Sequence, residues 1–247
     1  MKVSIIVSVF NNKNTIATAI NSIISQDYDD IECIVVDAGS IDGTIEIIKG
    51  FADRINTFIS EPDKGIYDGL NKGILLATGD IIAFLHSDDV YENETVISDV
   101  VAIFNDDIQG VYGDLVYTNK ADMRKVFRYW KSCDFSVSLL RIGWMPPHPT
   151  LFLRRKVYQK YDTFDISFKI AGDYDFMLRI LKDNIAVKYL PQVLYRMRVG
   201  GKSNRSIKSI LFKSKEDLRA MRKNGIDKPF LTLFYKNISK VIQLIRH

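Results

Sequence analysis

Cysteine is scarce in this sequence, with only Cys33 and Cys133 among 247 residues. The two positions lie far apart and fit no metal-binding or redox spacing, so neither a disulfide scaffold nor a thiol motif is indicated. Cys33 lies inside an apolar run, where a small buried side chain is expected. A chain without disulfides is typical of a reducing compartment.

Long hydrophobic runs are also missing. No stretch approaches the roughly 18–20 apolar residues that a membrane-spanning helix needs. The apolar segment Val3–Phe10 resembles a signal peptide, but it is short, has no small-residue cleavage site and is broken by Asn11–Asn14. We therefore expect a buried first strand, and a body that is soluble and cytoplasmic.

The glycine motifs of two nucleotide-binding classes are absent as well. Gly65, Gly69 and Gly73 are regularly spaced, but they fit neither the G-x-G-x-x-G pattern nor the P-loop. This spacing argues against a dinucleotide-dependent oxidoreductase and against a P-loop NTPase.

What the first half does contain is an alternation of strand and helix signals. Hydrophobic residues make up 47% and charged residues 26%, which suits one globular α/β unit. Strands are expected at 3–9, 31–36, 55–59 and 81–85, and helices after a cap at Asn12 or Asn14, at 44–52 and at 67–77. The alternation predicts an α/β fold with a mostly parallel, Rossmann-like sheet flanked by helices.

The second half is less regular. Residues 111–117 predict a strand with 125–130 as its hairpin partner, and a proline-rich segment leads into a strand at 150–153. A helix is expected to begin at Asp173, followed by short strands at 187–190 and 193–197.

Polar residues follow three of the expected parallel strands: Asn11 and Asn12 after the first, Asp37 after the second and the pair Asp88–Asp89 after the fourth. In sheets of this kind ligands bind beyond the carboxyl ends of the strands. These residues therefore predict one shared cleft.

The adjacent carboxylates Asp88 and Asp89 are the sharpest feature of this edge. Two acids ending a buried strand are costly unless a cation neutralises them, and Mg²⁺ or Mn²⁺ uses one or two carboxylates together with substrate phosphates. The alternative is a turn or a helix cap. Similarly, Lys64 and Lys72 in the loop 60–73 either face phosphates or belong to a solvated loop.

Five ordered motifs give the chain a specific resemblance. They are Val3–Asn11, Val36–Thr44 (VDAGSIDGT), Glu61–Asp68 (EPDKGIYD), Ala77–Asp89 (ATGDIIAFLHSDD) and Ala171–Phe176 (AGDYDF). Over residues 1–200 the chain resembles a family 2 glycosyltransferase with the GT-A fold, an enzyme that moves a sugar from a nucleoside diphosphate to an acceptor hydroxyl.

The resemblance implies roles for particular residues. Those that would bind the nucleotide and donor sugar are Val9, Asn11, Asp37, Asp63, Lys64, Asp88, His148, Arg198, Lys202 and Ser203. Asp37 would hydrogen-bond the base, Asp89 would bind Mn²⁺ or Mg²⁺ on the diphosphate, and Asp173 would be the catalytic base of an inverting displacement. Helical geometry turns the rival Asp175 about 200° away from Asp173, so only one of them is expected to face the cleft.

Three of these assignments have structural alternatives. His148, after a rigid Pro-Pro pair, is either a ligand or a packed structural histidine. Trp144 either stacks on an acceptor sugar or packs in the core. The segment Arg198–Ser203 is either a lid that closes over the diphosphate or a plain basic loop.

The chain also departs from the family pattern. His86 and Gly172 stand where the family often has acidic residues, and no Gln-x-x-Arg-Trp sequence follows. The missing sequence, found in processive synthases, indicates the transfer of a single sugar.

The charge is concentrated at the carboxyl end. Residues 200–247 hold 12 Lys and Arg against 3 acids, a net charge of about +9. Because the whole chain has a net charge of +4, residues 1–199 carry about −5. Phe234, Ile238, Val241, Ile242 and Ile245 fall on one helical face. Such a basic amphipathic helix either rests on an anionic membrane or packs on the body, and no nucleic-acid motif accompanies it.

We therefore predict a GT-A catalytic domain at 1–204, with a nucleotide-sugar half at 1–115 and an acceptor half at 116–204, and a basic helical tail at 205–247. The predicted activity is inverting transfer of one hexose, from a UDP-linked donor to a saccharide acceptor on a lipid carrier, in surface-polysaccharide synthesis. The alternatives are a sugar-phosphate nucleotidyltransferase and a non-catalytic nucleotide-sugar-binding module. A nucleotidyltransferase should have a glycine-rich triphosphate loop where this chain has Asn11–Asn14.

Overall fold

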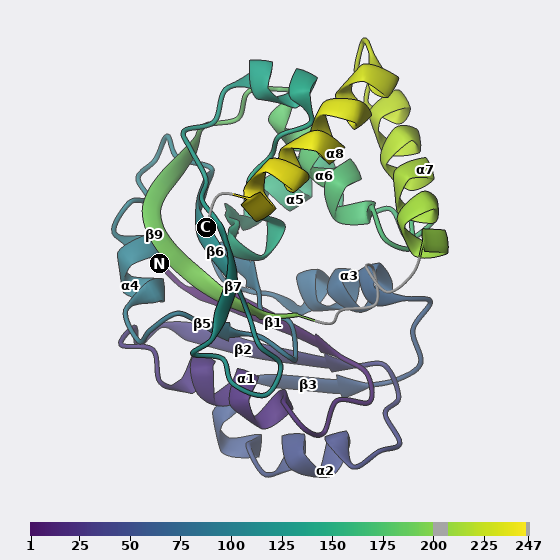
Figure 1. The fold of residues 1–247 in the computed structure, drawn as a ribbon. Helices are drawn as coiled ribbons and strands as arrows, with labels where there is room; N and C mark the ends of the chain where they lie inside the picture. The colour runs from purple at the N-terminus through teal and green to yellow at the C-terminus, as the bar shows by residue number, and fades with distance from the viewer. Residues whose placement is uncertain (200–206, 246–247) are drawn as a thin grey trace.

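One continuous nine-stranded sheet covered by helices organises the chain (Figure 1). The computed structural model describes residues 1–199 and 207–245, with side chains for residues 1–199 and 209–238. Lys202 and Ser203 lie outside the described residues.

The strands are β1 (Val3–Val9), β2 (Ile31–Asp37), β3 (Thr57–Ser60), β4 (Ile81–Phe84), β5 (Val90–Tyr91), β6 (Gly110–Thr118), β7 (Val126–Trp130), β8 (Phe152–Arg154) and β9 (Val187–Arg198). The α-helices are α1 (Ile16–Ile24), α2 (Thr44–Lys49), α3 (Ile66–Leu76), α4 (Val96–Val101), α5 (Arg155–Tyr161), α6 (Gly172–Leu181), α7 (Ile207–Lys223) and α8 (Pro229–Ile245). Short 3-10 helices are η1 (Ala52–Arg54), η2 (Val137–Ile142) and η3 (His148–Thr150).

The strand order is β3-β2-β1-β4-β8-β6-β9-β5, with β7 paired to β6 as the predicted hairpin partner. The strands β3, β2, β1 and β4 are parallel to one another. The strand β8 is antiparallel to both β4 and β6, and β9 is parallel to β6. The parallel half is the one predicted from the alternation, and the mixed half continues the same sheet.

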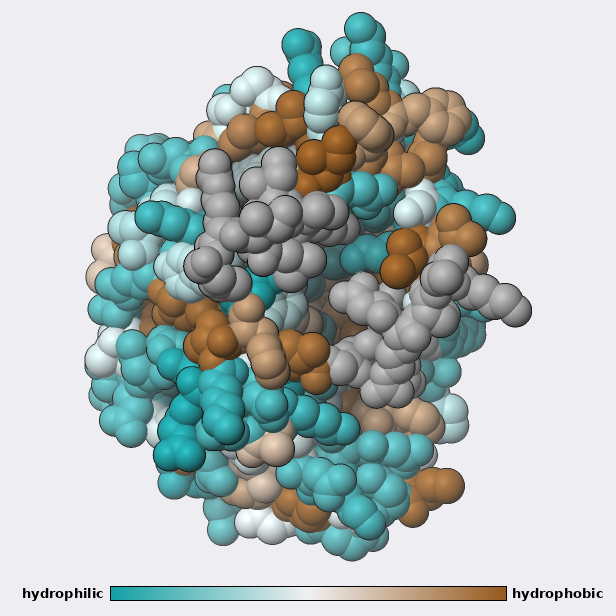
Figure 2. Space-filling model, viewed as in Figure 1, coloured by the Kyte–Doolittle hydropathy of each residue, from teal (hydrophilic) through white to brown (hydrophobic). Residues whose placement is uncertain are grey.

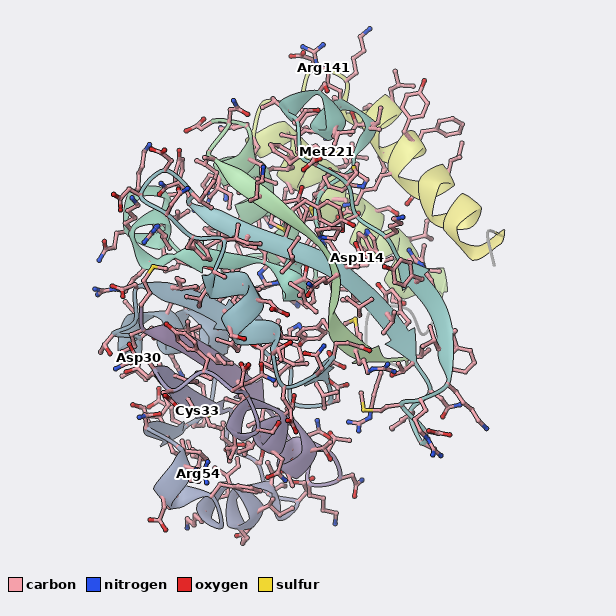
Figure 3. The ribbon with its side chains drawn as sticks, turned by 90° about the vertical axis from the view of Figure 1, so that its left-hand side faces the viewer. Asp30, Cys33, Arg54, Asp114, Arg141 and Met221 are labelled. Atoms are coloured by element: carbon pink, nitrogen blue, oxygen red, sulfur yellow. The ribbon has the colours of Figure 1, made fainter. Side chains whose placement is uncertain are left out.

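Both faces of the sheet are buried, which explains the continuous apolar runs of β1 and β2. Alternate residues of β1 enter different cores: Ile6 packs with α3 and α6, whereas Ile5 and Val7 pack with α1 and α4. Cys33 of β2 is 2% exposed, as expected for a small core residue. Figure 3 labels Cys33 and Asp114, which lie in the two halves of the sheet.

Helix α3 approaches β1 unusually closely at Gly73. A Cβ atom at this position would lie 2.3 Å from Cγ2 of Ile6. Gly69 and Gly73 therefore serve close packing on β1, whereas Gly65, just before the helix, has a positive φ of 124° and no close neighbour among the described residues. This packing fixes the start of α3, and with it Tyr67, which contacts Asp173.

Three sequence predictions needed correction. The strand expected at 150–153 begins with the 3-10 helix η3, because Pro147 and Pro149 favour a turn there, and β8 starts at Phe152. The two strands expected at 187–190 and 193–197 form the single strand β9, whose register with β6 shifts around Pro191. Neither Asn12 nor Asn14 caps α1 through its side chain; the cap residue is Thr15.

The carboxyl-terminal helices pack on the body, which was one of the two predicted alternatives. Helix α7 contacts α6, and α8 contacts α7, η2 and β7 (Figure 1). Ala220 and Met221 of α7 are fully buried in the core, and Figure 3 labels Met221 in this position. Among the described residues no helix is long and apolar enough to cross a membrane.

Candidate active site

Loops from three strands meet at the carboxyl edge of the parallel half, as predicted. The Asn11 side-chain oxygen accepts the N–H of Ile41 at 2.9 Å, and the N–H of Asn11 donates to Ser40 Oγ at 2.7 Å. Asn12 Nδ2 donates to Ser87 Oγ at 2.9 Å. The loops after β1, β2 and β4 therefore form one connected surface.

Asp37 is fully buried at the end of β2, opposite Val9 in the register with β1. Its Oδ2 accepts the N–H groups of Gly39 and Ser40, at 3.0 and 2.9 Å, and the hydroxyl of Ser60 at 2.7 Å. Its Oδ1 accepts the Ser40 hydroxyl at 2.5 Å. A carboxylate oxygen has two lone pairs, so Oδ1, which accepts one hydrogen bond among the described residues where Oδ2 accepts three, is the less saturated acceptor of this buried carboxylate.

Asp63 and Lys64 lie in the turn that precedes α3. Asp63 Oδ1 accepts the N–H of Gly65 at 2.9 Å, and the N–H of Lys64 donates to Asp68 Oδ2 at 3.0 Å. The Lys64 side chain is exposed. The Lys72 ammonium, in contrast, lies 2.8 Å from Glu61, so of the two lysines Lys64 is the better candidate for a phosphate.

The two acids after β4 differ in their exposure to solvent. Asp88 is partly exposed, whereas Asp89 is 1% exposed. Asp89 Oδ1 accepts the N–H of Arg198 at 2.8 Å, and Arg198 Nη1 donates to the carbonyl of Asp88 at 2.6 Å. Asp89 Oδ2 is buried with no hydrogen-bond partner among the described residues. Burial, and then the charge of Asp88, raise the pKa of Asp89 well above its usual value.

Asp173 lies in the first turn of α6 and is partly exposed. Its Oδ1 accepts the N–H of Tyr174 at 2.8 Å and lies 3.1 Å from the hydroxyl of Tyr67, which also donates to the carbonyl of Ile170 at 2.6 Å. Burial, and then the charge of Asp173, raise the pKa of Tyr67. Tyr67 therefore stays protonated. Its single proton is shared between the nearer carbonyl of Ile170 and Asp173 Oδ1, the longer of the two contacts.

His148 and His86 lie close enough to Asp173 to respond to its charge. The His148 residue is 6% exposed, and its ring packs against both Phe84 and Phe164, with centroids 5.4 and 5.5 Å away. Burial lowers the pKa of His148 to about 4, against the opposing effect of Asp173. Burial also lowers the pKa of His86, which Asp88 and Asp173 raise. Both imidazoles are therefore neutral near pH 7.

Asp175 is unavailable as a base. It is fully buried, and its carboxylate accepts Asn224 Nδ2 at 2.9 Å and Lys223 Nζ at 3.0 Å, with Arg179 at 3.2 Å. Asp173, in contrast, is partly exposed, so the two acids have different surroundings. Trp144 is partly buried against Tyr112, with ring centroids 6.5 Å apart, so packing is its observed role.

Sequence reasoning missed two contributors to this site. Tyr67 stands in a motif that was recognised, but its partner Asp173 is 106 positions away and no local pattern joins them. Glu216, in the tail, accepts three N–H groups of the segment just before Asp173. Only its position in a basic helix beside Asp217 could have marked it as unusual.

Within the described residues, no group of three or more His, Cys, Asp or Glu side chains is arranged to hold a metal ion. The pair Asp88–Asp89 is the local donor set. Two carboxylates suit Mg²⁺ or Mn²⁺, because these ions complete their shells with water and phosphate oxygens. The unpartnered Oδ2 of Asp89 and the mutual repulsion of the two acids fit a cation at this edge.

Comparison with known proteins adds a consistent set of similarities. The family model described as Glycosyl transferase family 2 matches residues 4–174. A PGL/p-HBAD biosynthesis glycosyltransferase of Mycobacterium bovis (strain BCG / Pasteur 1173P2) is 30% identical over 211 residues, which are 81% of this chain and 78% of that protein.

Two solved structures share the fold. The crystal structure of S. aureus TarS 1-349 in complex with UDP-GlcNAc has a TM-score of 0.70 and 20% identity, and covers 91% of this chain and 65% of that one. The mannosyltransferase PcManGT from Pyrobaculum calidifontis, in complex with GDP-Man and Mn2+, has a TM-score of 0.69 and 18% identity, and covers 99% of this chain and 72% of that one.

Proposed function

The chain belongs to glycosyl transferase family 2 and has the GT-A fold, and from this we propose that it is an inverting enzyme that transfers one hexose from a UDP-linked donor to a saccharide hydroxyl. One observation carries the proposal. Asp37 lies at the carboxyl end of β2 and the pair Asp88–Asp89 follows that of β4, while Asp173 in the first turn of α6 contacts Tyr67 at the start of α3. The carboxyl ends of the strands are where ligands bind in sheets of this kind.

We propose that the donor lies across the loops after β1, β2 and β4. Oδ1 of Asp37 would accept a donor of the base once the loops around this buried carboxylate admit it, and Lys64 is exposed for a phosphate. The proposed donor-binding residues remain Val9, Asn11, Asp37, Asp63, Lys64, Asp88, His148, Arg198, Lys202 and Ser203. A nucleoside diphosphate sugar donor is supported by the fold shared with TarS, solved with UDP-GlcNAc, and with PcManGT, solved with GDP-Man; uridine is our choice between the two bases.

Asp89, with Asp88 beside it, would hold a divalent cation. When bound, the cation would offset the charge that grows on the departing diphosphate. The chain's own contribution is to hold Asp89 in place through the N–H of Arg198. Arg198 also brings a second positive charge to the same edge.

Asp173 would accept the proton of the acceptor hydroxyl while that oxygen attacks the anomeric carbon on the face opposite the diphosphate. The N–H of Tyr174 and the shared proton of the Tyr67 hydroxyl orient the carboxylate, and a carboxylate suits a proton that leaves late in the reaction. The attack forms the new C–O bond as the C–O bond to the diphosphate breaks, so one displacement inverts the anomeric centre.

The test is the variant Asp173→Asn. We expect its affinity for UDP with Mn²⁺, measured by calorimetry, to stay within about twofold. Release of UDP in the presence of acceptor should fall by at least about 100-fold, the usual size of a lost general base. Asp183→Asn, an exposed acid after the same helix, is the matched control and should match the wild type in both assays.

Two outcomes would contradict the proposal. Unchanged transfer in Asp173→Asn would mean that the base lies elsewhere. If UDP, GDP and dTDP all fail to bind to the wild type in the presence of Mn²⁺, the proposed chemistry itself is wrong. Formation of a nucleoside diphosphate sugar from a sugar phosphate and a nucleoside triphosphate would identify a nucleotidyltransferase instead.

We further propose a lipid-linked saccharide acceptor, as in surface-polysaccharide synthesis, and peripheral binding at the inner face of the cell membrane. Apolar side chains of α8 are 39–66% exposed although the helix packs on the body: Phe230, Leu231, Phe234, Tyr235 and Ile238. Figure 2 shows hydrophobic residues gathered over the region of α8. An apolar helical face within a basic tail matches an anionic lipid surface.

Vesicle sedimentation tests this surface. The protein should sediment with phosphatidylglycerol vesicles more than with phosphatidylcholine vesicles, and salt should weaken the binding because charge attraction is screened. Phe230→Ser with Phe234→Ser should reduce binding by about 10-fold or more. Leu75→Ser, at an 80% exposed apolar position on α3, should leave binding unchanged, and equal binding by all variants would contradict the assignment.

A further inference from the structure

The segment 169–171, just before helix α6, is held from the tail by a single side chain. Glu216 of α7 is 6% exposed. Its Oε1 accepts the N–H of Lys169 at 2.9 Å, and its Oε2 accepts the N–H groups of Ile170 and Ala171 at 2.7 and 3.0 Å. Three consecutive backbone donors thus converge on one buried carboxylate.

These donors precede the N-terminus of α6, where N–H groups have no partner within the helix. A buried donor without a partner is costly. The negative charge of Glu216 also interacts favourably with the positive end of the helix dipole. The carboxylate therefore satisfies and fixes a part of the backbone that the helix cannot satisfy itself.

The opposite side of this segment is held by Tyr67. Its hydroxyl donates to the carbonyl of Ile170 at 2.6 Å and lies 3.1 Å from Asp173 Oδ1. There is no spare room at this contact, because a Cβ atom on Gly172 would lie 2.8 Å from the Tyr67 ring. A small shift of residues 169–171 would therefore be transmitted to the hydrogen bond on Asp173.

We infer that Glu216 is a positioning residue for transfer, acting on Asp173 through the backbone of residues 169–171 and the hydroxyl of Tyr67. The inference rests on the proposed role of Asp173 as the base. Glu216 lies outside residues 4–174, the part of the chain that matches the family model, so the tail supplies a component of the active site. Helix α7 then contributes to catalysis as well as to the hydrophobic core.

Asp217, the next residue on α7, provides a matched control. It is 2% exposed, and its Oδ1 lies 3.0 Å from Lys236 Nζ on α8, a close ion pair that is not aligned as a hydrogen bond. Asp217→Asn thus removes a buried negative charge from the same helix without touching residues 169–171. Both acids are expected to contribute to stability, but only Glu216 is expected to affect the base.

The first measurement is hydrogen–deuterium exchange of the full-length protein without ligand. In Glu216→Ala the amides of residues 169–171 should exchange about 10-fold faster or more, as expected for lost hydrogen bonds. Glu216→Gln should lie between Ala and wild type, because one amide oxygen can still accept the N–H groups of Ile170 and Ala171. Asp217→Asn should leave these amides unchanged.

The second measurement separates kcat from KM, with UDP-glucose, UDP-galactose and UDP-N-acetylglucosamine as donors and UDP release as the readout. Glu216→Ala should lower kcat by about 10- to 100-fold, since a misplaced catalytic group has an effect of this size. The donor KM and the affinity for UDP with Mn²⁺ should stay within about twofold. Glu216→Gln should recover part of kcat, and Asp217→Asn should keep the wild-type kcat.

Asp173→Asn, measured in parallel, distinguishes an error in the positioning role of Glu216 from an error in the assignment of the base. If Asp173→Asn abolishes turnover while Glu216→Ala keeps the wild-type kcat, the positioning role is wrong and the proposed function stands. If Asp173→Asn itself keeps turnover, the assignment of the base is wrong. If Glu216→Ala is too unstable to measure, a wild-type kcat in the folded Glu216→Gln variant would overturn the inference.

Discussion

Burial differs sharply between neighbouring acids of the candidate site. Asp173 and Asp88 are partly exposed, whereas their near neighbours Asp175 and Asp89 are almost completely buried. The buried member of each pair is bonded within the protein, Asp175 to α7 and Asp89 to Arg198. At the residue scale, Asp175 supports the structure around Asp173, whereas Asp89 keeps one buried oxygen, Oδ2, without a hydrogen-bond partner among the described residues.

The neutral histidine beside Asp173 predicts a pH-dependent stability. His148 has a pKa of about 4 in the folded protein, below the value of about 6.5 of an unfolded chain. The unfolded state therefore binds more protons below pH 6.5, and stability is lost as the pH falls from 6.5 towards 4. The free energy of unfolding should be about 2 kcal/mol smaller at pH 5 than at pH 7 from this group alone.

Urea unfolding at pH 7 and pH 5 measures this effect. His148→Phe keeps a ring between Phe84 and Phe164 but removes the titration, so the loss between the two pH values should shrink by about 2 kcal/mol. The same loss in the variant and the wild type would show that His148 does not carry this pH dependence.

At the residue scale the sequence predicts the strand-end acids but not the distant residues that contact them. Asp37, Asp88, Asp89 and Asp173 stand in ordered motifs, and the helical angle alone separated Asp173 from Asp175. The contacts of Tyr67 and Glu216 were out of reach, because they join residues 106 and about 45 positions apart. Such pairs depend on the tertiary fold, which no local spacing encodes.

Helix α3 connects the sheet to the site at the scale of secondary structure. Its centre touches β1 through Gly73, and its first turn carries Tyr67, which reaches Asp173. Because the helix is rigid, its distance from the sheet sets the position of the tyrosine hydroxyl. Packing under α3 is thus linked to the geometry of the proposed base.

Substitution Gly73→Ala tests this link. The added Cβ would meet Ile6 at 2.3 Å, so α3 must shift, at a cost of about 1–3 kcal/mol. We expect a lower free energy of unfolding in urea together with a lower kcat. Leu75→Ala, at an 80% exposed position on the same helix, should change stability by less than about 0.5 kcal/mol. Equal stability of the two variants would contradict the close-packing argument.

The elements that the sequence predicts well are those with a simple environment. Strands buried on both faces, such as β1 and β2, appear as continuous apolar runs. The difficult elements depend on proline and on pairing: Pro147 and Pro149 convert the start of one expected strand into η3, and β9 continues past Pro191 because β6 pairs on both sides of it.

At the scale of the whole molecule, the tail completes the catalytic body. The predicted tail, residues 205–247, contains Ala220 and Met221, which are fully buried, and Lys223 and Asn224, which bond to Asp175. The boundary predicted at residue 115, between the two halves, falls inside β6. Both observations indicate that the parts proposed from composition share one core.

Truncation measures how much the tail contributes to thermal stability. Removing residues 207–247 should expose the core under α7 and lower the thermal midpoint by more than 10 °C, since several buried side chains at about 1–3 kcal/mol each are lost. Removing only residues 239–247 keeps every described buried side chain of the tail and should shift the midpoint by only a few degrees. Equal midpoints for the two truncations would mean that α7 adds little to the core.

The order of the strands has a consequence for the way the chain reaches its native state. Strand β8, three residues long, joins β4 to β6, although about 70 residues separate it from β4 and about 40 from β6. Contacts between residues so distant in sequence require large loops to close, and the entropy lost in closing them precedes the favourable energy of the contact, which slows folding. Since the sheet is interrupted until β8 is in place, this late strand is expected to control the rate of folding. Substitutions in β8 should therefore slow refolding more than substitutions of equal cost in β3, which pairs only at the sheet edge.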